Sequence, residues 1–134
     1  MEFVHLKYCS DGRYPLYDAS NIGMTILGRF LISDVGCYWP TFREWAVDDK
    51  SDPKSRFTYS FGGNITDLEE EGDDIYLFDG TESMTEEIRA NGCKIPRLQF
   101  IQLLDDWKEK VCVPKPKEVM IKYENGQFVI ETKG

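Results

Sequence analysis

Ten carboxylates lie between Asp67 and Glu87, and this segment contains no lysine or arginine. The whole chain has 24 acidic and 16 basic residues, a net charge of -8. Outside the segment, 14 acidic and 16 basic residues remain, a net charge of +2. Concentrated charge attracts an oppositely charged partner better than scattered charge. The carboxylates are Asp67, Glu69, Glu70, Glu71, Asp73, Asp74, Asp79, Glu82, Glu86 and Glu87.

Few other groups in the chain suit catalysis. His5 is the only histidine, so most Ser-His-Asp and Cys-His arrangements are excluded unless His5 itself is the base. The cysteines lie far apart without a Cys-x-x-Cys, which argues against zinc and favours reduced, mostly buried thiols. A hydrolase needs one defined carboxylate pair, and a cluster of ten singles out none. We therefore expect no catalytic residue, no metal site and no cofactor. The four cysteines are Cys9, Cys37, Cys93 and Cys112.

The segment from Asp67 partly matches a calcium-binding loop, with acids at the first, third and fifth positions followed by Gly72. The twelfth position of such a loop requires a bidentate glutamate, and Phe78 stands there. The chain has no glycine-rich phosphate-binding motif, and its acidic balance disfavours nucleic acid as a direct ligand. These observations favour a basic protein as partner, although a solvated acidic segment without a partner explains the same pattern.

The length of 134 residues and an apolar content of 41% predict one globular domain over residues 1–134. No apolar run approaches the roughly 20 residues of a membrane span, and the N-terminus lacks a signal-peptide pattern. We therefore expect a cytoplasmic protein that does not bind a membrane.

Three stretches have the composition or alternation of strands. The IYLF run at 75–78 predicts a short strand between two acidic loops. Alternation over residues 1–9 predicts a first strand, and large residues alternate in FTYSF at 57–61. No periodicity is evident over residues 83–96.

Residues 22–35 allow two interpretations. The apolar spacing matches one face of a helix that Ser20 or Asn21 would cap, but Gly23 and Gly28 weaken it. A strand over 25–32 is the alternative, and Gly36 ends either element. The apolar residues are Ile22, Ile26, Leu27, Phe30 and Leu31.

Two further helices have clearer signals. Thr41 with Glu44 three residues later is a capping-box pattern, which predicts a short helix over 42–49 that buries Phe42 and Trp45. A longer helix is predicted over 97–112, after Pro96 and before two further prolines. Its apolar stripe is Phe100, Leu104, Trp107 and Val111, with Ile101 and Leu103 beside it.

The sequence pattern over residues 119–132 predicts a β-hairpin. Asn125-Gly126 is the preferred two-residue type I′ turn, and it sets the pairing of the two strands. Tyr123 then pairs with Phe128, Ile121 with Ile130, and Val119 with Thr132 on one face. That face is expected to pack on the helix at 97–112. The predicted fold is a single α+β domain with a mostly antiparallel sheet, in which the hairpin packs against two or three helices.

Aromatic residues supply a second kind of binding group. Tyr38 and Trp39 precede Pro40 in a predicted exposed loop, so we take them as aromatic anchors for a partner. With the acidic segment they form the predicted partner-binding set, which is Asp67, Glu69, Glu70, Glu71, Asp73, Asp74, Asp79, Glu82, Tyr38 and Trp39.

The chain resembles the bacterial immunity proteins that protect cells from polymorphic toxins, including toxins of contact-dependent growth inhibition. The resemblance lies in YDASNIGMTILGRFLISDVGCYWPTFREWAVDD, GGNITDLEEEGDDIYLFD and QFIQLLDDWKEKVCVPKPKEVMIKYENGQFVIE, about two thirds of the chain. It is a resemblance of layout that carries no catalytic motif. It implies a cognate toxin domain, often a ribonuclease or a deoxyribonuclease. With the acidic segment, this predicts a non-enzymatic inhibitor that pairs one-to-one with a basic toxin nuclease, for which a ribonuclease is the preferred prediction. The alternatives are a small acidic enzyme that uses carboxylates, and an adaptor for another basic protein.

Overall fold

The computed structural model describes residues 2–9, 14–36, 39–47, 66–71, 73–80 and 85–134. Nine of these residues are described by their backbone alone: Asp34, Trp39, Thr41, Trp45, Val47, Asp67, Glu69, Glu70 and Glu71. The predicted strand at 57–61 lies outside the described residues.

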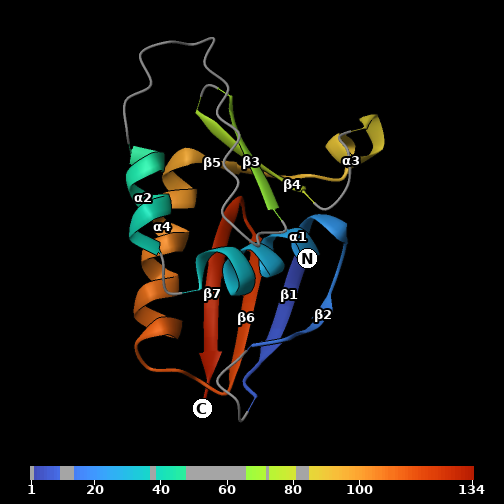
Figure 1. Cartoon of the computed structure of the whole chain (residues 1–134). Coiled ribbons are helices and arrows are strands. Elements are labelled where there is room, and N and C mark those ends of the chain that lie inside the picture. The colour runs from blue at the N-terminus through green and yellow to red at the C-terminus, as the bar shows by residue number, and fades with distance from the viewer. Residues whose placement is uncertain (1, 10–13, 37–38, 48–65, 72, 81–84) are drawn as a thin grey trace.

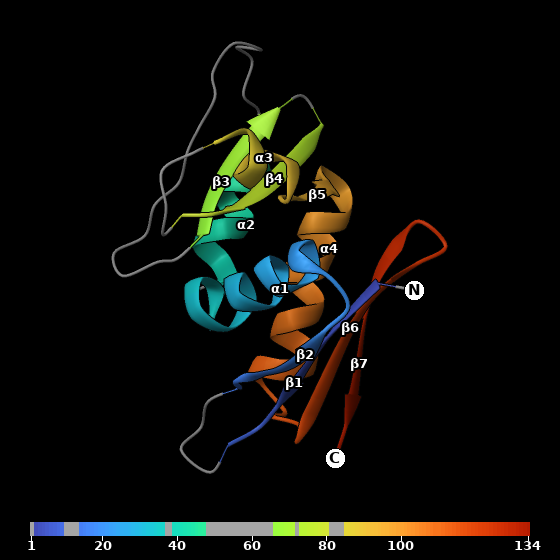
Figure 2. The ribbon, with the colours of Figure 1, turned by 90° about the vertical axis from the view of Figure 1, so that its right-hand side faces the viewer.

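Two antiparallel sheets and a helical layer form the described fold (Figure 1). The larger sheet has the order β2-β1-β6-β7 and the smaller one β3-β4-β5. The helices α1 and α4 cover one face of the larger sheet and also contact the smaller one (Figure 2). This arrangement confirms the α+β prediction. The elements are β1 (Glu2–Lys7), β2 (Leu16–Ala19), α1 (Ile22–Arg29), the π-helical η1 (Phe30–Val35), α2 (Trp39–Val47), β3 (Thr66–Glu71), β4 (Asp74–Asp79), α3 (Glu86–Ala90), β5 (Cys93–Pro96), α4 (Arg97–Trp107), the π-helical η2 (Lys108–Cys112), β6 (Glu118–Glu124) and β7 (Gln127–Lys133).

The open question over residues 22–35 is resolved in favour of a helix. Asn21 is the N-cap of α1, and its Oδ1 accepts a hydrogen bond from the Met24 backbone N–H at 2.9 Å. A Cβ at Gly28 would lie 2.7 Å from Val4 Cγ2, so glycine allows α1 to approach β1 closely. Ile22 is 56% exposed and does not share the buried face predicted for it, because it is the first residue of the helix. Gly36, at φ +50°, ends the helical segment.

The second helix begins earlier than predicted. It spans Trp39–Val47, so Thr41 lies inside α2 and is not its cap. Pro40 is the second helical residue, where the missing N–H costs no hydrogen bond. Phe42 is buried as predicted and packs edge-on against Phe30, with ring centroids 5.2 Å apart.

The long helix and the hairpin follow the sequence closely. All four stripe residues of α4 and η2 are at most 2% exposed. The hairpin has the predicted pairing throughout, and Asn125 and Gly126 have φ +54° and +76°. Val119, Ile121 and Ile130 on its inner face belong to the core, and β7 packs on α4.

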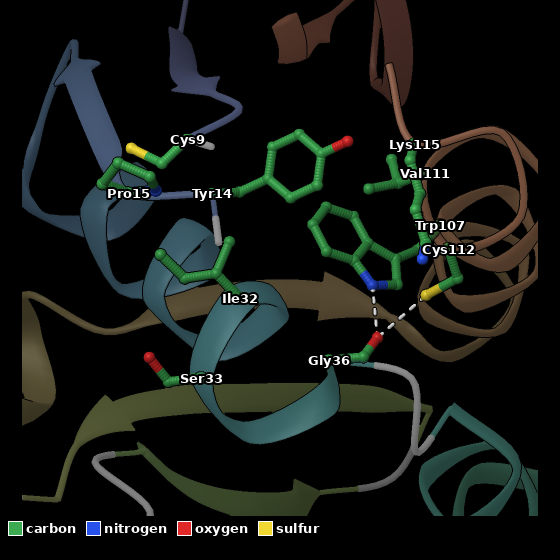
Figure 3. Close-up of a pocket in the computed structure, with 10 residues that line it drawn as sticks. All are labelled: Cys9, Tyr14, Pro15, Ile32, Ser33, Gly36, Trp107, Val111, Cys112 and Lys115. Carbon is green, nitrogen blue, oxygen red and sulfur yellow. Dashed lines mark hydrogen bonds between the residues drawn. The ribbon is translucent and has the colours of Figure 1, made fainter. Parts of the chain in front are cut away.

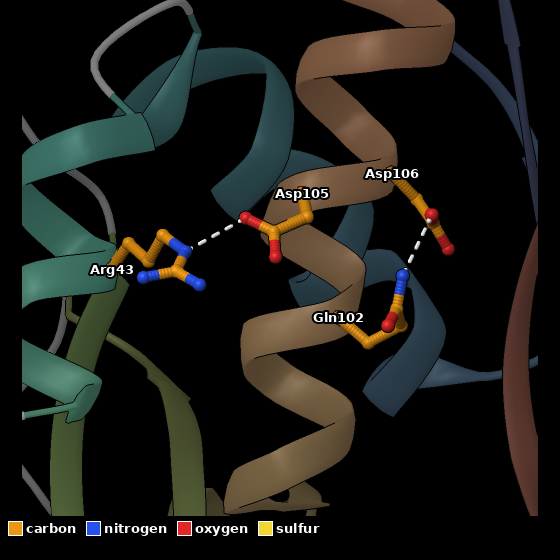
Figure 4. Close-up of polar contacts among 4 residues, drawn as sticks. All are labelled: Arg43, Gln102, Asp105 and Asp106. Atoms are coloured by element: carbon orange, nitrogen blue, oxygen red, sulfur yellow. Dashed lines mark hydrogen bonds and ion pairs between the residues drawn. The ribbon is translucent and has the colours of Figure 1, made fainter.

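Polar contacts join α2 to α4 (Figure 4). Arg43 Nε lies 2.8 Å from Asp105 Oδ1, and Arg97 Nη1 donates to the Ala46 carbonyl at 2.8 Å. On the outer side of α4, Gln102 Nε2 donates to Asp106 Oδ1 at 3.0 Å. The contacts of Arg43 and Arg97 hold α2 beside α4, whereas the bond from Gln102 lies within α4.

Candidate functional site: an acidic hairpin and a cavity

The first predicted acidic loop is wrong, because residues 66–71 form the strand β3. This strand pairs with β4 along its whole length, and it is one of the two edge strands of the described smaller sheet. Thr66 and Leu68 are 3% and 0% exposed, while Asp67, Glu69 and Glu71 occupy the alternate positions; Glu70 breaks this alternation, since it shares the parity of Thr66 and Leu68. The high charge hid a two-residue alternation that is typical of a strand. We call residues 66–79 the acidic hairpin.

The smaller sheet has two different faces. Ile75, Leu77 and Ile95 point into the core and are fully buried. On the other face, the rings of Tyr76 and Phe78 stack with centroids 5.9 Å apart. The register places Asp67 opposite Phe78 and Glu69 opposite Tyr76, which puts these β3 positions on the aromatic face.

Phe78 is buried against α3 and the residues that follow it. The Arg89 guanidinium lies 5.2 Å from the Phe78 ring centroid, and a Cβ at Gly92 would lie 2.6 Å from two ring carbons. The α3 helix itself was missed by the sequence analysis. Thr85 caps it by accepting from the Ile88 N–H at 3.2 Å, and Glu86 and Glu87 occupy its first turn, where the helix dipole favours acids.

One lysine neutralises part of the hairpin's charge. Lys94 Nζ on β5 lies 3.3 Å from Asp74 Oδ2 and 5.8 Å from the Tyr76 ring centroid. The hydrogen bond and the charge of Asp74 raise the pKa of Lys94 above its usual value. Asp73 at the turn is exposed, and Asp79 at the far end of β4 is half-buried.

Seven of the ten predicted partner-binding residues lie together on the acidic hairpin: Asp67, Glu69, Glu70, Glu71, Asp73, Asp74 and Asp79. Tyr38 and Glu82 lie outside the described residues. Trp39 is the first residue of α2, which corrects its assignment to a loop. The structure therefore gathers the acidic part of the predicted set, while its two aromatic anchors stay a prediction.

A cavity of about 560 Å³ is the feature that sequence reasoning missed (Figure 3). Three segments meet there: the described residues just after β1 and just before β2, the π-helical η1 with Gly36, and the end of α4 with η2 and Lys115. No local pattern signals the cavity, since its walls come from distant parts of the chain. The described lining residues are Cys9, Tyr14, Pro15, Ile32, Ser33, Gly36, Trp107, Val111, Cys112 and Lys115.

Hydrogen bonds fix the aromatic wall of this cavity. The Tyr14 hydroxyl donates to the Pro116 carbonyl at 2.5 Å, and burial is the main cause that raises the pKa of Tyr14 to about 12. Trp107 Nε1 and Cys112 Sγ both donate to the Gly36 carbonyl, at 2.7 and 3.0 Å. These side chains therefore present their carbon surfaces to the cavity more than their polar atoms.

The histidine and the three cysteines that the structure describes have no neighbours that would activate them. His5 Nε2 is 3.3 Å from Glu118 Oε1, and its ring contacts Tyr17 edge-on. Cys93 is buried, and burial raises the pKa of its thiol to about 12, which leaves it unreactive. Cys9 is exposed and Cys112 is half-buried, so among the described cysteines only Cys93 meets the expectation of mostly buried thiols. The described residues contain no cluster of three His, Cys, Asp or Glu side chains suited to a metal ion.

None of the helices in the described part of the chain has the length and apolarity needed to cross a membrane. Comparison with protein-family models, curated proteins and solved structures finds no match to this chain.

Proposed function

We propose that this protein binds and neutralises a basic toxin nuclease through the acidic hairpin. A ribonuclease is the nuclease class that we propose first. The support is the charge segregation, in which ten carboxylates lie within residues 67–87 and the rest of the chain has a net charge of +2. A nuclease carries lysine and arginine to hold phosphates, so an acidic surface of this kind competes with the nucleic acid. The resemblance to toxin immunity proteins supports the same assignment.

The two strands of the acidic hairpin place acids opposite each other. Glu71 and Asp74 are directly opposite each other at the turn end of the hairpin, where like charges destabilise a sheet, and the ion pair of Asp74 with Lys94 offsets part of this repulsion. The core does not need these acids, because Leu68, Ile75 and Leu77 bury the inner face. Charge that weakens the fold is consistent with a role in binding. Charge on an edge strand also prevents unwanted strand pairing, which is the explanation without a partner.

The alternative of an enzyme that uses carboxylates gains no support from the cavity, whose described lining contains no Asp or Glu. An adaptor for another basic protein would use the same hairpin and differ only in its partner. The experiment must therefore identify the partner as well as the surface.

The test compares two variants of equal charge. The hairpin variant carries Glu69→Lys, Glu71→Lys and Asp73→Lys. The control carries three reversals at exposed acids outside residues 67–87, namely Glu44→Lys, Glu109→Lys and Glu124→Lys. Tagged wild type and both variants are used to capture partners from the native host at low salt, followed by elution with rising salt.

We expect wild type and the control variant to retain a basic toxin domain that the hairpin variant loses. The captured domain should cleave RNA or DNA, and one equivalent of wild-type protein should abolish that cleavage. Retention by the hairpin variant equal to that of the control would remove the hairpin from the interface. A captured partner without toxin activity would favour the adaptor.

A further inference from the structure

Irregular backbone gathers around the cavity. Both π-helical segments that the structure describes line it, through Ile32 and Ser33 of η1 and through Val111 and Cys112 of η2. Segments of π-helix are rare and often occur at functional sites. Their convergence on one cavity is an observation independent of the cavity's size.

Lys115 adds a strained residue to the same wall. Its φ is +53°, a conformation that favours glycine, and it directly precedes Pro116. Its N–H bonds to the Val111 carbonyl at 3.0 Å, so it closes the helix end at a position that glycine usually occupies. Glycine would adopt this backbone conformation with less strain, whereas lysine places a positive charge at the cavity.

The lining defines the chemistry of a ligand. Pro15, Ile32 and Val111 supply apolar surface, and the rings of Tyr14 and Trp107 supply aromatic surface. Lys115 is the single charged residue in the described lining, so no carboxylate there opposes an anion. The volume of about 560 Å³ lies within the range of small-molecule sites.

We propose that this cavity binds a small aromatic carboxylate. The aromatic body packs among the side chains of Tyr14, Trp107 and Ile32, and the carboxylate pairs with Lys115. The site is separate from the acidic hairpin, and the proposal does not depend on the toxin-binding function.

Calorimetric titration of the 134-residue chain with two probes of nearly equal shape tests the proposal. The probes are 2-naphthoate and its uncharged analogue 2-naphthalenemethanol. Lys115→Asn removes the charge and keeps a residue that tolerates positive φ. Lys117→Asn is the matched control, because Lys117 is exposed two residues away and is not a lining residue. Ile32→Trp fills the cavity.

Wild type should bind 2-naphthoate about fivefold more tightly than the alcohol, as expected for one partly exposed ion pair. Lys115→Asn should remove this preference, Lys117→Asn should retain it, and Ile32→Trp should abolish binding of both probes. No heat with either probe at millimolar concentration would overturn the proposal. So would equal affinities for the two probes, or equal losses in the Lys115 and Lys117 variants. If Ile32→Trp does not fold, the comparison of the two lysine variants decides the outcome.

Discussion

Replacing Gly92 by alanine tests the packing beneath the acidic hairpin. The new Cβ would lie 2.6 Å from two ring carbons of Phe78 and 3.0 Å from the Leu77 carbonyl oxygen. Phe78 is fully buried and stacks on Tyr76, so its ring has little room to move. Overpacking of this kind costs about 1–3 kcal/mol. The smaller entropy of the unfolded alanine chain offsets about 0.4–1 kcal/mol of that cost.

We therefore expect Gly92→Ala to lower the free energy of unfolding by about 1–2 kcal/mol. With an m-value of about 2 kcal/mol/M, the urea midpoint falls by about 0.5–1 M. Gly23→Ala is the matched control, because its Cβ would meet no atom closer than 3.4 Å. That variant should be neutral or stabilised by up to about 1 kcal/mol, since alanine favours a helix.

A double-mutant cycle measures how much of this cost comes from contact with the Phe78 ring. Phe78→Leu removes the ring that the new Cβ would contact, so Gly92→Ala should cost at least about 1 kcal/mol less in that background. A urea midpoint for Gly92→Ala equal to or above wild type would refute the close approach of residue 92 to Phe78. Equal costs of Gly92→Ala in both backgrounds would place the strain elsewhere.

Three further predictions concern the cap, the cavity and the partner. Asn21→Ala should lower the free energy of unfolding by about 1 kcal/mol because the bond to the Met24 N–H is lost; an unchanged melting temperature would contradict this. The pKa of Tyr14 is raised from 10.0, its value in an unfolded chain, to about 12 in the folded protein. The free energy of unfolding should therefore fall as the pH rises between these two pKa values, because the folded state keeps a proton that the unfolded state loses. Urea titrations at about pH 9 and about pH 11 should show a smaller loss of unfolding free energy for Tyr14→Phe than for wild type. Equal losses in the two proteins would contradict this prediction. Partner association should slow at least tenfold, as an order of magnitude, between low and physiological salt in stopped-flow measurements; a rate independent of salt would exclude electrostatic steering.

Local chemistry was enough to predict part of the fold. Asn125-Gly126 accommodates positive φ at both turn residues, so the turn set the register of β6 and β7 without tertiary information. The four-residue stripe of α4 is long enough for its period to be unambiguous. Both elements depend on residues close in sequence, and both are observed as predicted.

Competing signals explain the errors. Composition outweighed periodicity at β3, where Asp67 and the three glutamates after Leu68 suggested a loop. At α2, the Thr41 capping pattern competed with Pro40, and the proline position prevailed. The cavity was beyond sequence reasoning altogether, because Tyr14, Ile32 and Lys115 meet only when three distant segments fold together.

The position of β1 has a consequence for synthesis of the protein. The strand made first lies between β2 and β6, and β6 begins only at Glu118. Until the C-terminal hairpin is available, β1 has one paired side and one open side, and open strand edges recruit other chains. The larger sheet therefore closes only once β6 has been made, and β1 keeps an open edge while the roughly hundred residues between β1 and β6 are synthesised.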